Sequence, residues 1–596
     1  MTSQELRQLF ITYFKKNGHR LIPSSSLIPE NDPSVLFTTA GMQQFKPYYL
    51  SLKDPFKDDH LSLGEPLKSR NIITCQKCFR TTDINEVGDR SHLTFFEMLG
   101  NFSFGGYFKK EAIQLMFDFL FKELEIDEQR ASFTFFSGNN NIPSDEESYQ
   151  ILKSLSIPDE KIKQGKEDNF WGPTGMIGPC GPTVEVYVDG IELWNLVFNE
   201  YYFNEKKEYQ PLKQKGVDTG MGLERLTLIT QFPQDETKTI FDTDLFAPLM
   251  DYLFQFLPQD QEGLKTARIF ADHIKSIVFL LSEGILPSNT DRGYVVRRLI
   301  RRIARFLEKY QLAKEMIFNL VDLVVAMYSL EYPEIDKKEE IKKVLLDELL
   351  KFEKTLARGL KIFEELIETK EKENQKIITG LEAFNLYQSY GFPLELIKEM
   401  AQEKSFSVNE EDFQKEITHH QEISRAGKEK KFGGHGLKGL ITTPEQEKMV
   451  KLHTSAHLLL AALKKIVDSN IQQKGSDINS ERLRFDFSLD RKLTDKEIKE
   501  IEKLINQKIQ EGLEVDYYET SYEDAIKRGA EGVFKERYPE KVKVYVIKDK
   551  RGEIFSQEIC AGPHVKNTRE IGKFKILKQE SVSSGVKRIK AVIEDT

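Results

Sequence analysis

The sequence predicts an α+β fold divided among several domains, on three observations. Residues 1 to about 235 mix short β-rich runs, such as SVLFTT and TVEVYVDG, with glycine and proline turns. The pattern is helical from about 236 to 420 and becomes mixed again from about 442. A chain of 596 residues is long enough for about three to five domains, each with a core of its own.

The change of pattern along the chain divides it into four parts. We expect a first α+β domain over residues 1–235, a helical domain over 236–420 and a second α+β domain over 442–596. Residues 421–441 contain SRAGKEKKFGGHGLKGL, whose five glycines and four lysines are typical of a linker. No repeat of fixed period is present.

The composition excludes a membrane-spanning or disulfide-stapled protein. The first residues, MTSQELRQLFITYFKKNGHR, contain no apolar segment of the signal-peptide type. The most apolar stretch, IFNLVDLVVAMYSL, is interrupted by Asn319 and Asp322 and is too short to cross a bilayer. Four cysteines in so long a chain do not make a disulfide framework. We therefore expect a cytoplasmic protein.

One segment is strongly basic although the net charge is −9. Residues 292–305, RGYVVRRLIRRIAR, contain six arginines. On a helical wheel five of them share one face opposite an apolar face: Arg297, Arg298, Arg301, Arg302 and Arg305. A solvated charged face is the alternative, but such faces normally mix lysine, glutamate and arginine. The pattern therefore favours a polyanionic partner, such as a nucleic acid.

Two glycine-containing segments of the first domain are candidates for ligand binding. TFFEMLGNFSFGGYF (94–108) alternates aromatic residues with glycines. VDTGMGLERL (217–226) contains Gly220 and Gly222, which allow close backbone approach, and Arg225, which is suited to a flat ring or a phosphate. Each segment alone is a weak signal, and the chain has neither a P-loop nor a GxGxxG motif opening a βαβ unit.

Two distant segments combine into a candidate metal site. In HTSAHLLLAAL (453–463), His453 and His457 lie on one helical face, which by itself also fits a core helix. The downstream EICAGPHV adds Cys560 and His564. HxxxH and CxxxH together supply four nitrogen and sulfur ligands suited to Zn²⁺. Cys75 and Cys78 form a CxxC without a second one; a structural role is favoured over zinc binding there.

In order along nearly the whole chain, these segments resemble the class II aminoacyl-tRNA synthetases, and within them the alanyl-tRNA synthetase family. DPSVLFTTAGMQQFKPYYL (32–50), with Pro33, is similar to the first class II motif; CQKCFR with HLTFFEMLGNFSFG is similar to the second, and VDTGMGLERL to the third. FWGPTGMIGPCGPTVEVYVD and ELWNLVFNEY resemble the strands between them. RIFADHIKSIVFLLSEGILPSNTDRGYVVRRLIRR resembles the family's helices that bind the tRNA acceptor stem.

The resemblance implies an antiparallel-sheet catalytic domain, a helical tRNA-binding domain and an α+β editing domain. It implies that alanine is activated with ATP and Mg²⁺ to alanyl-adenylate and transferred to tRNA(Ala). Because an alanine pocket cannot exclude glycine by size and rejects the added hydroxyl of serine poorly, a second site that hydrolyses Ser- or Gly-tRNA(Ala) is the physical remedy.

The resemblance also implies roles for single residues. Arg80 would hold the ATP α-phosphate, Asp218 the alanine ammonium group, and Phe96 with Arg225 the adenine; Arg80, Asp218 and Arg225 are the catalytic set. The implied contacts are Arg80, Phe96, Glu97, Met98, Gly222 and Arg225 for ATP; Trp171, Val197, Asp218 and Gly220 for alanine; Asn289, Arg292, Arg297, Arg298, Arg301 and Arg302 for tRNA; His453, His457, Cys560 and His564 for Zn²⁺; and Gln473 for the editing substrate.

The sequence departs from the family's pattern at four places. Residues 437–452 leave no room for the β-barrel subdomain that the family carries before its HxxxH helix. CAGPHV resembles the editing domain of threonyl-tRNA synthetase, which binds no zinc. The chain stops at Thr596 without the family's coiled coil and C-terminal domain, so we expect a monomer that edits in cis. Gln388 stands where the family has aspartate.

Two other interpretations of the sequence remain. The chain could be a different class II synthetase, of which threonyl-tRNA synthetase is the nearest, or a non-catalytic tRNA-binding or editing-only paralogue.

Overall fold

The computed structural model describes residues 1–594 except 30–31, 33–34, 174, 176, 419–442, 490, 533–540 and 584. Pro33 and the predicted linker 421–441 therefore lie outside the described residues. The chain separates into two units, Met1–Ile378 with Asn385–Val408, and Thr379–Phe384 with Asn409–Thr596. Among the helices that are described, none is both long and apolar enough to cross a membrane.

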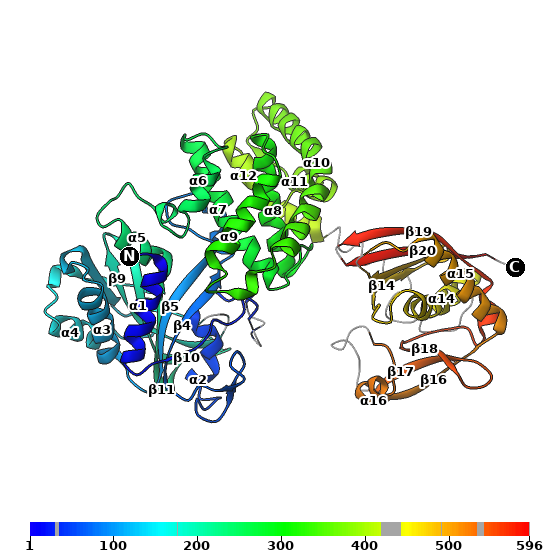
Figure 1. Cartoon of the computed structure of the whole chain (residues 1–596), viewed down its shortest axis with the longest axis horizontal. Coiled ribbons are helices and arrows are strands. Elements are labelled where there is room, and N and C mark those ends of the chain that lie inside the picture. Colours follow the sequence, from blue (N-terminus) through cyan, green and yellow to red (C-terminus); the bar gives the residue numbers. More distant parts are fainter. Residues whose placement is uncertain are drawn as a thin grey trace. The chain divides into compact units, whose positions relative to one another are not determined.

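A large, mostly antiparallel sheet forms the base of the first unit (Figure 1). Its strands run in the order β1-β4-β5-β11-β10-β9-β6-β7, with β8 paired to β9. Their bounds are β1 Arg20–Leu21, β4 Asn71–Phe79, β5 Phe95–Phe104, β6 Ala131–Phe136, β7 Ile162–Gly165, β8 Phe170–Trp171, β9 Gly178–Val188, β10 Ile191–Phe203 and β11 Tyr209–Gly222. The predicted antiparallel sheet in an α+β chain is confirmed.

Short helices and a hairpin complete this part of the first unit. The helices are α1 Ser3–Lys16, α2 Lys46–Tyr49, α3 Lys109–Asp118, α4 Glu146–Ser154 and α5 Leu223–Gln231, and β2 Asp59–His60 pairs with β3 Glu65–Pro66. The side chain of Thr2 caps α1 and Glu5 returns the bond, a capping box that satisfies two backbone N–H groups. The apolar face of α1 buries Phe10 and Phe14 against Trp194 of β10. This contact attaches α1 to the large sheet.

A bundle of helices follows the sheet in the same unit. It contains α6 Ala247–Leu253, α7 Gln261–Ser282, α8 Asp291–Lys309, α9 Glu315–Tyr328, α10 Lys338–Lys372 and α12 Leu394–Glu403, with β12 Ile377–Ile378 paired to β13 Ser407–Val408. The helix α11 spans Gly380–Tyr390. Figure 1 shows α7, α8, α9 and α10 side by side. Burial of Leu299, Ile300 and Ile303 holds the apolar face of α8 in this bundle.

The described part of the second unit includes two antiparallel sheets with the helices α14, α15 and α16. A four-stranded sheet, in the order β14-β15-β20-β19, packs on α14 and α15. A three-stranded sheet, in the order β16-β17-β18, packs on α16. The bounds are α14 Pro444–Ile466, β14 Gln473–Ile478, β15 Leu483–Ser488, α15 Asp495–Glu511, β16 Glu514–Ser521, α16 Tyr522–Lys527, β17 Lys541–Lys548, β18 Ile554–Ile559, β19 Lys573–Ser583 and β20 Val586–Glu594. Leu458 and Leu459 of α14 are fully buried in the core with Phe485, so α14 is held firmly.

Candidate functional site

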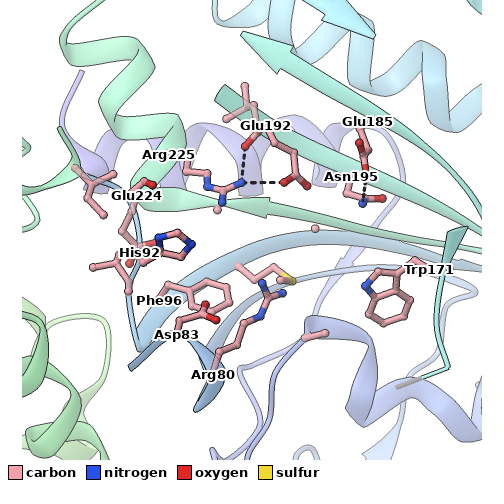
Figure 2. Close-up of a pocket in the computed structure, with 18 of the residues that line it drawn as sticks. Arg80, Asp83, His92, Phe96, Trp171, Glu185, Glu192, Asn195, Glu224 and Arg225 are labelled. Atoms are coloured by element: carbon pink, nitrogen blue, oxygen red, sulfur yellow. Dashed lines mark hydrogen bonds and ion pairs between the residues drawn. The ribbon is translucent and has the colours of Figure 1, made fainter. Parts of the chain in front are cut away.

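A pocket of about 530 Å³ opens on one face of the large sheet (Figure 2). Its floor comes from the central strands, where Gly222 pairs with Met98, Gly220 with Asn195, and Asp218 with Val197. The structure brings together nine of the residues predicted to contact ATP or alanine: Arg80, Phe96, Met98, Trp171, Val197, Asp218, Gly220, Gly222 and Arg225. Segments more than a hundred residues apart in sequence thus form one site.

The side chain of Glu97 is not brought into this pocket. Successive side chains of a strand point to opposite faces, so Phe96 and Met98 face the pocket and Glu97 faces the other side of the sheet. Its fully buried carboxylate accepts hydrogen bonds from Arg7 (2.9 Å) and from the hydroxyl of Tyr332 (2.7 Å). Glu97 therefore links the sheet to Arg7 and Tyr332 on the face opposite the pocket.

One end of the pocket presents cationic and aromatic side chains. The guanidinium carbon of Arg80 lies 4.9 Å from the ring centroid of Phe96. Arg225, at the start of α5, donates to the backbone oxygen of Glu192 (2.7 Å) and to its carboxylate (3.2 Å). Figure 2 shows Phe96 and Arg225 on opposite sides of the pocket. A flat ring can lie between them and gain a cation–π contact, while Arg80 offers charge to a phosphate.

The other end of the pocket presents a buried carboxyl group. Asp218 is 5% exposed, and burial raises its pKa to about 8. A group in this state gains most from a positively charged partner, which restores its ionised form. Figure 2 shows Trp171 on the side of the pocket away from Phe96 and Arg225. The lining residue Val197 lies directly across the strand pair from Asp218, so this end suits a small ammonium compound.

Several polar lining residues were missed by the sequence prediction. Glu185 of β9 is buried and accepts hydrogen bonds from the amide of Asn195 (3.2 Å) and the hydroxyl of Tyr187 (2.9 Å). Asp83, His92, Asp168 and Glu192 also line the pocket. The alternation of β10 could have identified Asn195, because it lies two residues before Val197. Glu185 depends on the register of β9 against β10, which the sequence does not reveal.

Carboxylates from other helices accompany the arginine face of α8. Glu348 of α10 accepts from both Arg297 (2.9 Å) and Arg301 (2.8 Å). Glu399 of α12 binds Arg302 at 2.8 Å, and Arg302 is 4% exposed. Arg305 pairs with Glu403, and Arg298 lies 3.9 Å from Glu395. A helical wheel of residues 292–305 could not reveal these partners, because they come from residues about 50 to 100 positions later in the chain.

The most open part of this region lies at the start of α8 and in the residues just before it. Asn289 is exposed and accepts a hydrogen bond from Arg297. Arg292 is partly exposed and donates to the backbone oxygen of Leu36. These two residues, among the six predicted to contact tRNA, are the best placed to contact a large partner.

Cys75 and Cys78 do not converge on a common ligand. They lie three residues apart on β4 and therefore point to opposite faces. Cys75 lies 3.5 Å from the Glu97 carboxylate, and burial raises the pKa of the Cys78 thiol to about 12. This geometry favours the structural role.

In the second unit the four predicted metal ligands come together. His453 and His457 project from α14, Cys560 follows β18, and His564 follows the next turn. Their candidate ligand atoms all lie within 4.8 Å of one another. Gln473 opens β14, where its amide donates to the hydroxyl of Ser476 (3.1 Å).

Hydrogen bonds orient the three imidazoles of this group, which we call the His/Cys group. The Nδ1 atom of His453 lies 3.2 Å from the carbonyl oxygen of Pro563, and that of His457 lies 3.2 Å from the Glu558 carboxylate. The Nδ1 atom of His564 lies 3.3 Å from the hydroxyl of Thr454. Each Nδ1–H thus has an acceptor, which directs each Nε2 towards the centre, as in metal sites with oriented histidines.

The chemistry of the centre fits a soft or borderline cation. The Nε2 atom of His564 is buried and has no hydrogen-bond partner among the described residues. Burial opposes ionisation of Cys560, but the charge and hydrogen bonds of the neighbouring imidazoles hold the pKa of its thiol well below the usual range. Three imidazole nitrogens and a thiolate form a ligand set typical of Zn²⁺.

Comparison with known proteins places both units in related families. Residues 5–482 match the family model of class II (A) tRNA synthetases, and residues 542–590 match the second additional domain of threonyl and alanyl tRNA synthetases. The alanine-tRNA ligases of Borrelia hermsii and Treponema denticola are 41% and 42% identical over all of this chain and over 100% and 99% of their own.

Two further proteins match this chain less closely. The alanine-tRNA ligase of Thermotoga maritima is 36% identical over 99% of this chain and 80% of its own, in an alignment of 725 positions. An aspartyl tRNA synthetase structure from Entamoeba histolytica is 14% identical and covers 41% of this chain and 56% of its own, with a TM-score of 0.24.

Proposed function

This chain belongs to the alanine-tRNA ligase family of class II tRNA synthetases, and from that premise we infer that it couples alanine to tRNA(Ala) and edits the product. It activates alanine with ATP to alanyl-adenylate and transfers the alanyl group to tRNA(Ala). It also hydrolyses Ser- or Gly-tRNA(Ala) at a second site, consistent with the domain shared by threonyl and alanyl synthetases. The observation that carries the proposal is the pocket that unites Arg80, Phe96 and Arg225 with Asp218.

We assign the four predicted parts of the chain to successive tasks. Residues 1–235 carry aminoacylation, and residues 236–420 bind the tRNA acceptor stem. Residues 442–596 carry editing, and residues 421–441 link the editing domain to the rest. We place the enzyme in the cytoplasm and propose that it acts as a monomer; sedimentation at micromolar concentration checks the latter.

In the first step, adenine lies between Phe96 and Arg225, and Arg80 binds the α-phosphate. The ammonium group of alanine binds Asp218, with Trp171 and Val197 limiting the space for its side chain. The alanine carboxylate then attacks the α-phosphorus in line and pyrophosphate leaves. Negative charge grows on the phosphoryl oxygens in the transition state, and Arg80 stabilises it.

In the second step, a ribose hydroxyl at the end of tRNA(Ala) attacks the carbonyl carbon of alanyl-adenylate, and AMP leaves. Neither step needs a nucleophilic side chain, because the site contributes positioning and charge neutralisation. Mg²⁺ requires oxygen ligands, which the ATP phosphates and the lining carboxylates of Asp83 and Glu192 offer. When bound, the ion neutralises phosphate charge.

For the editing site we propose one Zn²⁺ held by His453, His457, Cys560 and His564. The Nε2 atom of His564 supports this assignment, because it is buried and lacks a hydrogen-bond partner among the described residues, and such an atom is costly without a ligand. A bound metal ion supplies positive charge beside the ester carbonyl that hydrolysis must polarise. Gln473 would contact the aminoacyl group.

Pyrophosphate exchange measured with each standard amino acid tests the activity. We expect strong exchange with alanine, weaker exchange with serine and glycine, and none with threonine. A threonyl enzyme would instead respond to threonine, and an editing-only paralogue would show no exchange with any amino acid.

Arg292→Glu is expected to weaken tRNA(Ala) binding about tenfold and to reduce the slope of log affinity against log salt by about 1, because it removes one phosphate contact. Exchange with alanine should stay unchanged, since Arg292 lies outside the pocket. Filter binding at several salt concentrations measures the slope, and Lys57→Glu, at a side chain 80% exposed, is the matched control. An unchanged slope would contradict the assignment.

Arg298→Glu and Arg302→Glu, at two of the residues implied to contact tRNA, are also expected to weaken tRNA binding, but with a cost in stability. Arg302 is buried against Glu399, so a glutamate there would place two carboxylates together. Thermal unfolding separates this effect from a loss of phosphate contact.

A further inference from the structure

One face of the three-stranded sheet β16-β17-β18 continues into the His/Cys group. Tyr517 of β16 pairs with Tyr545 of β17, and Tyr545 pairs with Glu558 of β18. Residues directly opposite one another on antiparallel strands lie on the same face, so these three side chains form one row. The row ends at the metal site, because Glu558 is the carboxylate that holds His457.

The aromatic rings of this row follow one another outward from the His/Cys group. The ring centroid of Tyr545 lies 4.3 Å from that of His564. The centroid of Tyr517 lies 5.3 Å from that of Tyr545, at an interplanar angle of 39°. The ammonium nitrogen of Lys543 lies 4.7 Å from the centroid of Tyr517. These rings form a continuous aromatic surface with a cation at its outer end.

The core of the second unit does not explain this surface. The opposite face of the same sheet already packs Val544, Val546 and Ile559 against Ala525 of α16. The side of the sheet that carries Tyr517 instead leaves this residue 48% exposed. The exposed ring of Tyr517 therefore continues the row of rings beside the His/Cys group and is accessible to a ligand.

The chemistry of editing determines what must lie beside the His/Cys group. The ester that is hydrolysed joins the amino acid to the ribose of the last nucleotide of tRNA. When the ester reaches the centre, the base of that nucleotide lies within one nucleotide's length of it. Unpaired bases stack on aromatic side chains regardless of sequence, and a nearby lysine binds the linking phosphates.

We propose that Tyr545 and Tyr517, with Lys543, form a stacking platform for the unpaired 3′-terminal nucleotides of mischarged tRNA(Ala). The platform delivers the aminoacyl ester to the His/Cys group. This inference rests on the proposed editing function and adds the surface that holds the nucleic acid. The competing explanation is that the tyrosines are a cross-strand pair that stabilises the sheet; Lys543 also lies 3.8 Å from the Glu519 carboxylate.

Deacylation of Ser-tRNA(Ala) by the full-length chain tests the platform. Tyr517→Ala should raise KM about tenfold, as expected for the loss of one stacked base, and leave kcat within about twofold of wild type. Tyr517→Phe keeps the ring and should behave like wild type. Alanine charging should be unaffected in both variants. Equal KM values for wild type and Tyr517→Ala would overturn the proposal, as would a loss of kcat with lowered thermal stability and unchanged KM.

A binding measurement keeps this test independent of editing activity. In tRNA(Ala) carrying 2-aminopurine in place of its terminal adenine, stacking quenches the fluorescence on binding. We expect wild type and Tyr517→Phe to quench more strongly than Tyr517→Ala. If wild type quenches but does not deacylate Ser-tRNA(Ala), the editing function fails while the platform stands. If Tyr517→Ala quenches as strongly as wild type, the platform itself fails.

Discussion

Asp218→Asn is expected to lower kcat/KM for alanine in pyrophosphate exchange by about 100- to 1,000-fold. A buried carboxylate that binds an ammonium group contributes a charge-assisted contact, and its loss in a pocket costs about 3–4 kcal/mol of transition-state stabilisation. KM for ATP should change little, because Asp218 lies at the alanine end of the pocket. Exchange near the wild-type rate would contradict the assignment of Asp218.

The pH dependence gives this prediction a control within the same experiment. Because burial raises the pKa of Asp218 to about 8, the free enzyme carries a protonated Asp218 at lower pH and must lose that proton to bind an ammonium group. The apparent KM for alanine should therefore fall about 10- to 100-fold as pH rises from about 6 to about 8. The asparagine variant should not show this change.

Stability distinguishes loss of a contact from loss of the fold. A carboxyl group whose pKa is higher in the folded than in the unfolded state stabilises the fold at low pH, and this contribution is lost as pH rises through about 8. Asp218→Asn removes the buried charge, so at about pH 9 its melting temperature should be at least that of the wild type. A lower value would mean that the exchange defect reflects misfolding.

Cys560→Ala is expected to reduce deacylation of Ser-tRNA(Ala) by about 100-fold or more while alanine charging stays near normal. The thiolate is one of four proposed ligands, and removing even a residue that orients a ligand typically costs 10- to 100-fold in metal affinity or activity. Serine charged to tRNA(Ala) should accumulate, and the zinc content of the purified protein should fall below one per chain.

Two measurements would contradict this reading of the His/Cys group. A Cys560→Ala variant that still clears Ser-tRNA(Ala) would show that the group is not the editing centre. A wild-type protein purified without zinc that edits normally would show that the histidines act without metal. Alanine charging by the same preparations is the internal control, because its pocket lies in the other unit.

Local spacing and residue type determined much of the candidate chemistry. The HxxxH spacing places His453 and His457 on one face of a helix because a turn of helix takes 3.6 residues, and the structure has both on α14. Alternation of side chains in a strand likewise fixes that Phe96 and Met98 share a face. The resemblance, which follows the same order along the chain, indicated which distant residues meet, because homologous chains share one fold.

Contacts between distant segments decided the rest. Glu97 was assigned to ATP with its neighbours, but its side chain faces the opposite side of the sheet, where Arg7 and Tyr332 bind it. The sequence of α8 shows no negatively charged partner for its arginine face, but in the structure Glu348 and Glu399 pack against that face from later helices. Ion pairs and strand register depend on which elements meet in space, and neither propensity nor periodicity encodes that choice.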